Sequence, residues 1–176
     1  MILKGKVWKF GDEVDTDVII PTQYCELTPD QYKKHVMEPL RKDFYSLVRE
    51  GDFIFAGEAF GIGSSRGHAV VAIKEAGIRA IVAVTFGRIF YRSSINEGLP
   101  VFVCPEAYQR TDEGDLVQID VVSGRIENKS KNLEFRFQPF SDLVLKIILA
   151  GGGVNYFTKN LKAIEQAISR GDRISS

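Results

Sequence analysis

Three short apolar segments alternate with two helical patterns between residues 53 and 103, and this alternation constrains the fold most strongly. The apolar segments are FIFAG, AIVAV and LPVFV, and the helical patterns between them are HAVVAIKEA and GRIFYRSSINEG. Strands joined through helices run parallel in one sheet, because the crossover returns the chain to the same edge. The sequence therefore predicts an α/β domain with a mainly parallel β core and crossover helices.

The first fifty residues add two predicted strands and one predicted helix. Residues 4–10 and 17–20, KGKVWKF and DVII, are short apolar segments of the strand type. A helix is predicted to begin at Pro29, because Thr28 and Gln31 match a capping box and proline suits the first helical position.

The last third of the chain changes character. Residues 116–137 predict short strands with turns at Ser123-Gly124 and near Ser130-Lys131, which would be antiparallel additions to the core. Helices are predicted after Ser141, which suits an N-cap, and again over residues 154–168. Because no linker or internal repeat interrupts the pattern, residues 1–176 are predicted to form a single domain.

The composition argues against several classes of function. Lysine and arginine together number 23, as do aspartate and glutamate, and no basic stripe stands out that would bind nucleic acid. No apolar run approaches the roughly 20 residues of a membrane span, and the first residues lack the apolar core of a signal peptide. Cys25, Cys104 and two histidines are dispersed, so we expect reduced thiols, no metal site in this chain and a cytoplasmic location.

The loop between the first apolar segment and the first helical pattern has the composition of an anion site. Gly61 and Gly63 let the backbone approach a ligand, and Ser64, Ser65 and Arg66 follow directly. In a parallel sheet this loop lies beyond the carboxyl end of a strand, where ligands bind. With a helix start near Arg66, backbone amides and the guanidinium would together bind a carboxylate or phosphate.

Simpler interpretations of the same residues stay open. Glycine and serine at a strand-to-helix turn can serve only to turn and cap the chain. Arg66 stands at the third glycine of a G-x-G-x-x-G pattern, so the dinucleotide fingerprint is not met. His68 fits a surface or core histidine better than a catalytic one, and Cys104 fits a small buried apolar residue.

Three segments, in this order and spacing, resemble one known family. They are VDTDVIIP, AGEAFGIGSSRGHAVVAIKEAGIRAIVA and FGRIFYRSSINEGLPV. In them the chain is similar to the small subunits of 3-isopropylmalate dehydratases and, more broadly, to the swivel domain of the aconitase superfamily. The resemblance runs from about Lys4 to Val103 and, more loosely, to the C-terminus. It implies a swivel-type domain.

The resemblance implies a hydro-lyase reaction. Family members remove water from a hydroxy carboxylate and add it back at the neighbouring position, here isomerising 2-isopropylmalate and 3-isopropylmalate in leucine biosynthesis. It implies that Ser64 is the catalytic base, that Ser65 and Arg66 bind the substrate carboxylate, and that Asp17 is an acidic active-site residue. It also implies a [4Fe-4S] cluster held by three cysteines of a separate large subunit, so that activity requires that partner.

The chain departs from the family pattern at two places. The family commonly has glutamate after the arginine of G-S-S-R, where this chain has Gly67, and its FARIFYRNAIN segment appears here as FGRIFYRSSIN. Neither change touches the two serines or the arginine. Both leave a divergent substrate or reduced activity open, including a non-catalytic module that binds an anion through the same loop.

The resemblance also points to a specificity loop at Tyr24, Cys25, Glu26 and Leu27. Relatives that act on tricarboxylates tend to have an arginine at the position of Glu26, and isopropylmalate relatives have apolar residues. Glu26 would repel a third carboxylate, while the other three residues would line an alkyl pocket. The alternative is that Glu26 points to solvent. Isopropylmalate is therefore the expected substrate, with homocitrate, citramalate or another substituted malate as alternatives.

Overall fold

The computed structural model describes residues 1–63 and 67–169, with side chains up to residue 161. Its strands form one sheet in the order β4-β3-β2-β1-β5-β6-β7. Their bounds are β1 (Ile2–Phe10), β2 (Phe53–Ala56), β3 (Ala80–Ala83), β4 (Val101–Val103), β5 (Leu116–Asp120), β6 (Arg125–Asn128) and β7 (Leu133–Arg136).

Strand β1 belongs to both halves of this sheet. Its residues 7–10 pair in parallel with β2, and β2, β3 and β4 continue the parallel part. Its residues 2–6 pair antiparallel with β5, and β6 and β7 continue the antiparallel part. The predicted parallel core with antiparallel additions is therefore confirmed.

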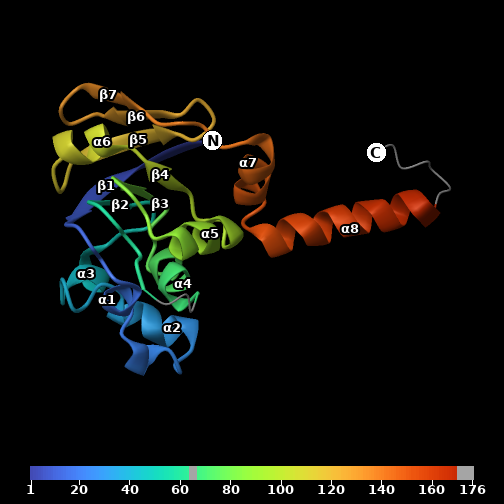
Figure 1. Cartoon of the computed structure of the whole chain (residues 1–176), viewed down its shortest axis with the longest axis horizontal. Coiled ribbons are helices and arrows are strands. Elements are labelled where there is room, and N and C mark those ends of the chain that lie inside the picture. Colours follow the sequence, from blue (N-terminus) through green and yellow to red (C-terminus); the bar gives the residue numbers. More distant parts are fainter. Residues whose placement is uncertain (64–66, 170–176) are drawn as a thin grey trace.

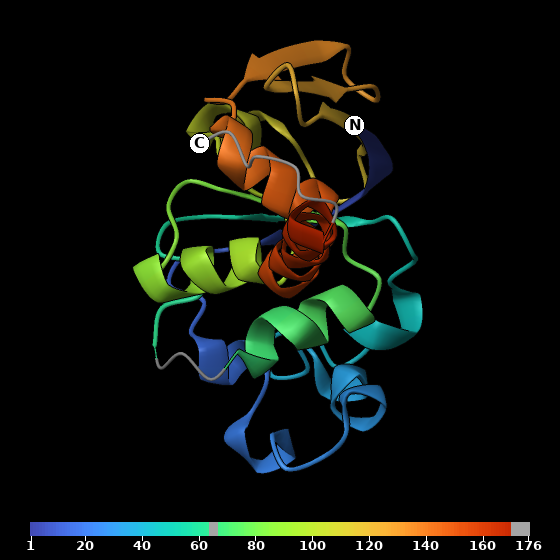
Figure 2. The same cartoon turned by 90° about the vertical axis from the view of Figure 1, so that its right-hand side faces the viewer.

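Helices α4 and α5 cover one face of the parallel strands, α6 packs on the other, and α8 projects from the body (Figures 1 and 2). Helices α4 and α5 are the crossovers from β2 to β3 and from β3 to β4. The helix bounds are α1 (Thr16–Ile19), α2 (Pro29–Tyr32), α3 (Phe44–Leu47), α4 (His68–Glu75), α5 (Arg88–Asn96), α6 (Pro105–Arg110), α7 (Asp142–Leu149) and α8 (Gly153–Ser169), with 3₁₀ turns η1 (Thr22–Tyr24) and η2 (Lys33–His35).

The parallel strands are buried on both faces. Ile54 of β2 packs into a cluster that includes residues of α4 and α5. Phe53 and Phe55, its neighbours on the same strand, point the other way into a cluster with Ile119 of β5 and Phe135 of β7. Because both faces are covered, these strands are continuous apolar runs rather than alternating ones.

The predicted strand at residues 17–20 is wrong, because this segment is largely helical as α1. Asp15 caps the helix, and its Oδ1 accepts a hydrogen bond of 2.8 Å from the backbone amide of Asp17. The amide of Thr16 donates to the carbonyl of Ile62 at 2.7 Å, which fixes the position of the first turn. The apolar pattern alone could not reveal this tertiary contact.

Helix α2 begins at Pro29 as predicted, and the Gln31 side chain accepts a hydrogen bond of 3.1 Å from the amide of Thr28. The helix lasts only to Tyr32 and continues as the 3₁₀ turn η2. Helix α6, which begins at a proline directly after β4, was not predicted.

Candidate active site

The loop that follows β2 runs between the loops that follow β1 and β3. On the β1 side, the amide of Gly61 donates to the carbonyl of Val14 at 2.7 Å, and Ile62 accepts from Thr16 at the same distance. This pairing extends the parallel register beyond the strands as an isolated bridge between Asp15 and Ile62. The β2 loop is thus held in place up to the residue before Gly63.

The β3 side holds the same loop from the opposite edge. The amide of Phe60 donates to the carbonyl of Thr85 at 3.0 Å, and the amide of Gly87 donates back to the carbonyl of Phe60 at 2.8 Å. Gly87 is also the N-cap of α5, so this contact fixes where that helix begins. The amino ends of α4 and α5 therefore lie at the same edge of the sheet.

Two glycines allow the close approach that this arrangement requires. A Cβ on Gly61 would lie 2.2 Å from Cγ of Phe90, and one on Gly63 would lie 2.6 Å from Oδ1 of Asp15. Both also have positive φ, +76° and +108°, a region that favours glycine. The glycines predicted to bring backbone close to a ligand thus also bring it close to α5 and to the cap of α1.

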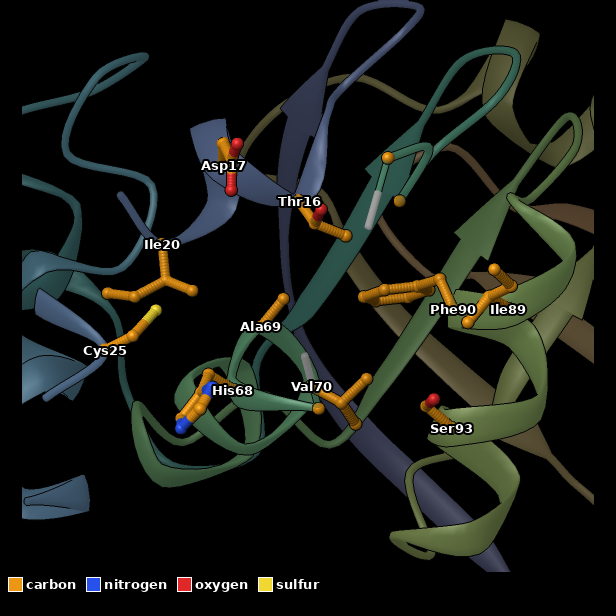
Figure 3. A pocket seen from close by; sticks show the side chains of 13 residues that line it. Thr16, Asp17, Ile20, Cys25, His68, Ala69, Val70, Ile89, Phe90 and Ser93 are labelled. Atoms are coloured by element: carbon orange, nitrogen blue, oxygen red, sulfur yellow. The ribbon is translucent and has the colours of Figure 1, made fainter. Parts of the chain in front are cut away.

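A pocket that is partly open to solvent lies beside this loop. Figure 3 shows Ile20 and Cys25 on one side of it and side chains of α5 on the other, with Val70 of α4 between them. The described residues that line it are Thr16, Asp17, Ile20, Cys25, Gly61, Gly63, Gly67, His68, Ala69, Val70, Ile89, Phe90 and Ser93. They come from four different segments of the chain.

Asp17 is one of the predicted site residues that the structure places at the pocket. It lies in the first turn of α1 and is exposed, and its Oδ1 accepts a hydrogen bond of 3.1 Å from the hydroxyl of Thr22. Ser64, Ser65 and Arg66 lie outside the described residues. Their neighbours on either side, Gly63 and Gly67, both line the pocket.

The predicted specificity loop contributes one described pocket residue, Cys25. The Tyr24 ring stacks on the His35 ring with the centroids 3.7 Å apart, which ties it to η2 instead. Glu26 and Leu27 are exposed and are not among the described residues that line the pocket.

Several pocket residues were not singled out from the sequence. Val70 lies in the first turn of α4, and Ile89, Phe90 and Ser93 lie in the first two turns of α5. The usable signal is positional, since the amino ends of crossover helices meet at the carboxyl edge of a parallel sheet. Ile20 was missed as a pocket residue because residues 17–20 were predicted to form a strand.

Helix α4 begins at His68 rather than near Arg66. The His68 ring meets the Tyr32 ring edge-on, with the centroids 5.7 Å apart. Its Nδ1 is buried without a hydrogen-bond partner among the described residues, although the histidine lines the pocket. An ordinary core or surface histidine would have a hydrogen-bond partner or water at each ring nitrogen. Among the described residues, Nδ1 of His68 has no such partner, so the simple interpretation does not account for it.

The described residues contain no group of three or more histidine, cysteine or acidic side chains that could hold a metal ion. Cys25 and Cys104 are both free thiols, and they pack against different clusters. Burial raises the pKa of the Cys104 thiol, as expected for a small buried apolar residue. None of the helices in the described residues is long and apolar enough to cross a membrane.

The family description "Aconitase C-terminal domain" matches residues 13–106, more than half of the chain. The chain belongs to the aconitase C-terminal domain family. All the described residues that line the pocket fall within this match. The family assignment thus covers the glycine loop, the amino ends of α4 and α5, and the wall from α1.

Relatives of this aconitase-type chain are similar over nearly their whole length. One is the 3-isopropylmalate dehydratase small subunit of Thermodesulfovibrio yellowstonii, 48% identical over 92% of this chain and 96% of its own. Another is the methanogen homoaconitase small subunit of Methanothermobacter thermautotrophicus, 50% identical over 96% of each chain. The crystal structure of 3-isopropylmalate dehydratase from Methanocaldococcus jannaschii matches with a TM-score of 0.89 and 44% identity, over 94% of this chain and 98% of that one.

Proposed function

We propose that this chain is the small subunit of a hydro-lyase that interconverts 2-isopropylmalate and 3-isopropylmalate by dehydration and rehydration. The observation that carries the proposal is the 48% identity, over 92% of the chain, to a relative named as that small subunit. The pocket supports it, because Ile20, Val70 and Phe90 give it an apolar wall. Each methylene of a branched alkyl group buried there contributes about 0.8 kcal/mol.

Homocitrate is the second candidate substrate, because a relative that is 50% identical is named as a homoaconitase small subunit. Homocitrate has a third carboxylate, which needs a cation or several hydrogen-bond donors when it is desolvated. Among the residues that the structure describes, the pocket wall holds no lysine or arginine. Asp17, which is in that wall, would repel another carboxylate. Beyond Arg66, which is proposed to bind one substrate carboxylate, the described wall offers no cation to a third carboxylate, and this favours isopropylmalate.

In the proposed reaction, residues 64–66 supply the polar chemistry. Ser64, as its alkoxide, takes the proton from the carbon next to a substrate carboxylate and becomes a neutral hydroxyl. The hydroxyl of the neighbouring carbon takes up a proton from a general acid of the partner subunit and leaves as water, so that a carbon–carbon double bond forms. Addition of water in the opposite sense gives the isomer. A serine hydroxyl is a weak base at neutral pH, so it has to act as a stabilised alkoxide. The amino end of α4 and Arg66 are proposed to stabilise that charge.

Ser65 and Arg66 are proposed to bind the substrate carboxylate, with Asp17 facing the same substrate. These roles come from the family resemblance. They are supported by the position of the flanking residues Gly63 and Gly67, which line the pocket together with Asp17. A guanidinium can bind a carboxylate through two parallel hydrogen bonds, which also fixes its orientation.

The proposed partner is a large subunit that holds the [4Fe-4S] cluster. The described residues of this chain do not fit such a group, because they offer no cluster of metal ligands and the two thiols pack separately. We therefore infer that the pocket is one half of an active site that the two subunits share.

The test is a substrate panel assayed with the reconstituted pair of subunits. We expect kcat/KM for 2-isopropylmalate to exceed that for homocitrate and citramalate by about 10-fold or more, since specificity is a difference of transition-state free energies. A higher kcat/KM for homocitrate would establish the second candidate. If the chain binds the partner but the pair turns over none of these acids, the chain is a non-catalytic module that binds an anion.

A Glu26→Arg variant probes the specificity loop in the same assay. If Glu26 faces the variable end of the substrate in the complex, charge reversal shifts the kcat/KM ratio toward homocitrate by about 10-fold or more. An unchanged kcat/KM ratio would mean that Glu26 faces solvent. The wall that contacts the alkyl group would then be formed by Cys25 and Ile20, which line the pocket.

A further inference from the structure

Two arginines at the amino end of α5 have no partner within the described part of the chain. Arg88 and Arg92 are exposed and make no hydrogen bond, ion pair or ring contact with any described residue. The other arginines that the structure describes each bond to a carboxylate or a carbonyl; they are Arg41, Arg49, Arg79, Arg110, Arg125 and Arg136. The two exceptions are four residues apart, on one side of one helix.

The isolated fold gives no reason for this placement. Arg88 is the first residue of α5, where the helix dipole disfavours a cation, and no acidic residue lies in the first turn. Arg88 and Arg92 also repel each other, because residues four apart are neighbours on a helix surface. Charges that destabilise a helix, with no compensating contact inside the chain, indicate a role in binding something outside it.

The surface around the two arginines is hollowed and partly apolar. They line one hollow together with Ile89 and another together with Tyr91 and Val103. Ile89 and Val103 are 50% and 48% exposed, which is high for large apolar side chains. Arginine and tyrosine are enriched in protein interfaces, and the buried part of an interface is more apolar than the rest of the surface.

This surface is continuous with the candidate active site. Gly61, Gly63 and Ile89 line both the pocket and the first of these hollows. The second hollow extends away from the pocket as far as Val103 at the end of β4. The surface therefore extends beyond the pocket that would hold a small acid, and it borders the opening that a large subunit has to cover.

We propose that Arg88 and Arg92 dock onto acidic side chains of the large subunit at the edge of the shared active site, with Ile89 and Val103 as apolar contacts. The inference rests on the proposed function, because that function supplies the partner. Carboxylates are the expected counterparts, since each guanidinium can form two parallel hydrogen bonds to one of them. Pairing with these carboxylates would also offset the repulsion between the two like charges.

The test measures the Kd between the purified large subunit and a double variant, Arg88→Glu with Arg92→Glu. We expect Kd to rise by about 100-fold or more at low salt, mainly through slower association, and the salt dependence of wild-type binding to be largely lost. Replacing both arginines by glutamine should give a smaller rise in Kd. Circular dichroism and thermal melting of the free variants verify that they fold.

The matched control is Arg79→Glu with Arg136→Glu, which makes the same charge change at side chains that are 58% and 72% exposed. We expect its Kd to stay within about 3-fold of wild type, since rim and remote charges contribute little to affinity. Equal Kd values for the two double variants would overturn the proposal. An unchanged Kd with a raised KM would also overturn it and would assign the arginines to substrate binding. Because Kd is measured without turnover, a wrong substrate assignment does not affect this test.

Discussion

Gly67 has a φ of +66° and is the N-cap of α4. It stands where the family pattern usually has glutamate. A Cβ at this position would meet nothing within 4 Å, so space does not exclude a larger residue. The backbone conformation does disfavour one, by about 1–2 kcal/mol. In the conformation that Gly67 adopts, backbone strain rather than lack of space would therefore oppose a glutamate.

At the residue scale, Ser64 has the most specific proposed role. Ser64→Ala in the complex of both subunits should lower kcat by about 100-fold or more, because proton abstraction is lost, while KM stays within a few-fold. Steady-state kinetics measure both values. The control is Ser93→Ala, which removes another hydroxyl from the pocket wall and should change kcat by less than about 10-fold. A Ser64→Ala complex with wild-type kcat would show that the base lies elsewhere.

The two thiols should differ in reactivity. Cys25 lines the pocket, whereas Cys104 is 3% exposed and burial raises the pKa of its thiol, so less thiolate is present at a given pH. Iodoacetamide should therefore alkylate Cys25 in the folded chain and reach Cys104 only after unfolding. Mass spectrometry of the labelled peptides gives the result, with Cys25→Ser as the unlabelled control. Equal labelling of both thiols in the folded chain would contradict the packing described.

At the element scale, the glycine loop after β2 also packs against α5, in addition to its proposed role in binding a ligand. Gly61→Ala would combine a positive φ with a contact of 2.2 Å to the Phe90 ring, and should reduce the free energy of unfolding by about 2–5 kcal/mol. Gly67→Ala shares the positive φ but meets open space, and should cost about 1–2 kcal/mol. Urea denaturation compares the two variants. Equal decreases in the free energy of unfolding would mean that the packing of Phe90 against Gly61 adds no cost.

Asp52 joins β1 to the segment that leads into β2. Its carboxylate is 5% exposed and accepts hydrogen bonds from the amides of Lys6 and Arg49 and from Nε1 of Trp8. Asp52→Asn replaces one acceptor oxygen by a donor and leaves at least one of these buried groups unpaired. It should reduce the free energy of unfolding by about 1–3 kcal/mol.

The matched control for Asp52 is Asp43→Asn, a change on an exposed side chain. We expect it to alter the free energy of unfolding by less than about 0.5 kcal/mol. Thermal or urea unfolding of both variants checks this difference. Similar losses for the two would mean that the hydrogen bonds of Asp52 contribute nothing specific to the joining of β1 and β2.

The elements that sequence analysis predicted correctly are those with a local signal. Continuous apolar runs marked β2 and β3, and glycines that end α4 and α5 at Gly77 and Gly98 have the positive φ expected after a helix. The errors lie where tertiary contacts decide. Residues 17–20 have a strand-like pattern, but Asp15 caps a helix there and the contact between Thr16 and Ile62 fixes its first turn.

At the scale of the whole molecule, the candidate site is built from more segments of the chain than the glycine-serine motif that first indicated it. The sequence motif predicted the loop, because glycines, serines and arginine stand together there, and the family resemblance added Asp17. It could not locate Val70, Phe90 and Ser93, since they meet only after α4 and α5 pack side by side on one face of the sheet. Nor could it reveal the unpaired arginines of α5, because a missing partner is a property of the folded chain.

The pocket and two absences among the described residues, of a fitting metal-ligand group and of partners for Arg88 and Arg92, lead to one account. In this account, one edge of the parallel sheet is proposed to carry half of a site that a second subunit completes. An enzyme with a shared site depends on the concentration of both chains, because neither half alone contains the full set of catalytic groups. The isolated chain is therefore expected to be inactive.

The most direct measurement is a titration of the large subunit with this chain, with 2-isopropylmalate turnover as the readout. The account predicts no turnover by this chain alone, and a rate that rises with added chain and levels off at equimolar amounts. Iron and sulfide analysis of the free chain should find no stoichiometric cluster. Turnover or a bound cluster in the isolated chain would contradict the account, as would a large subunit whose rate does not change when this chain is added.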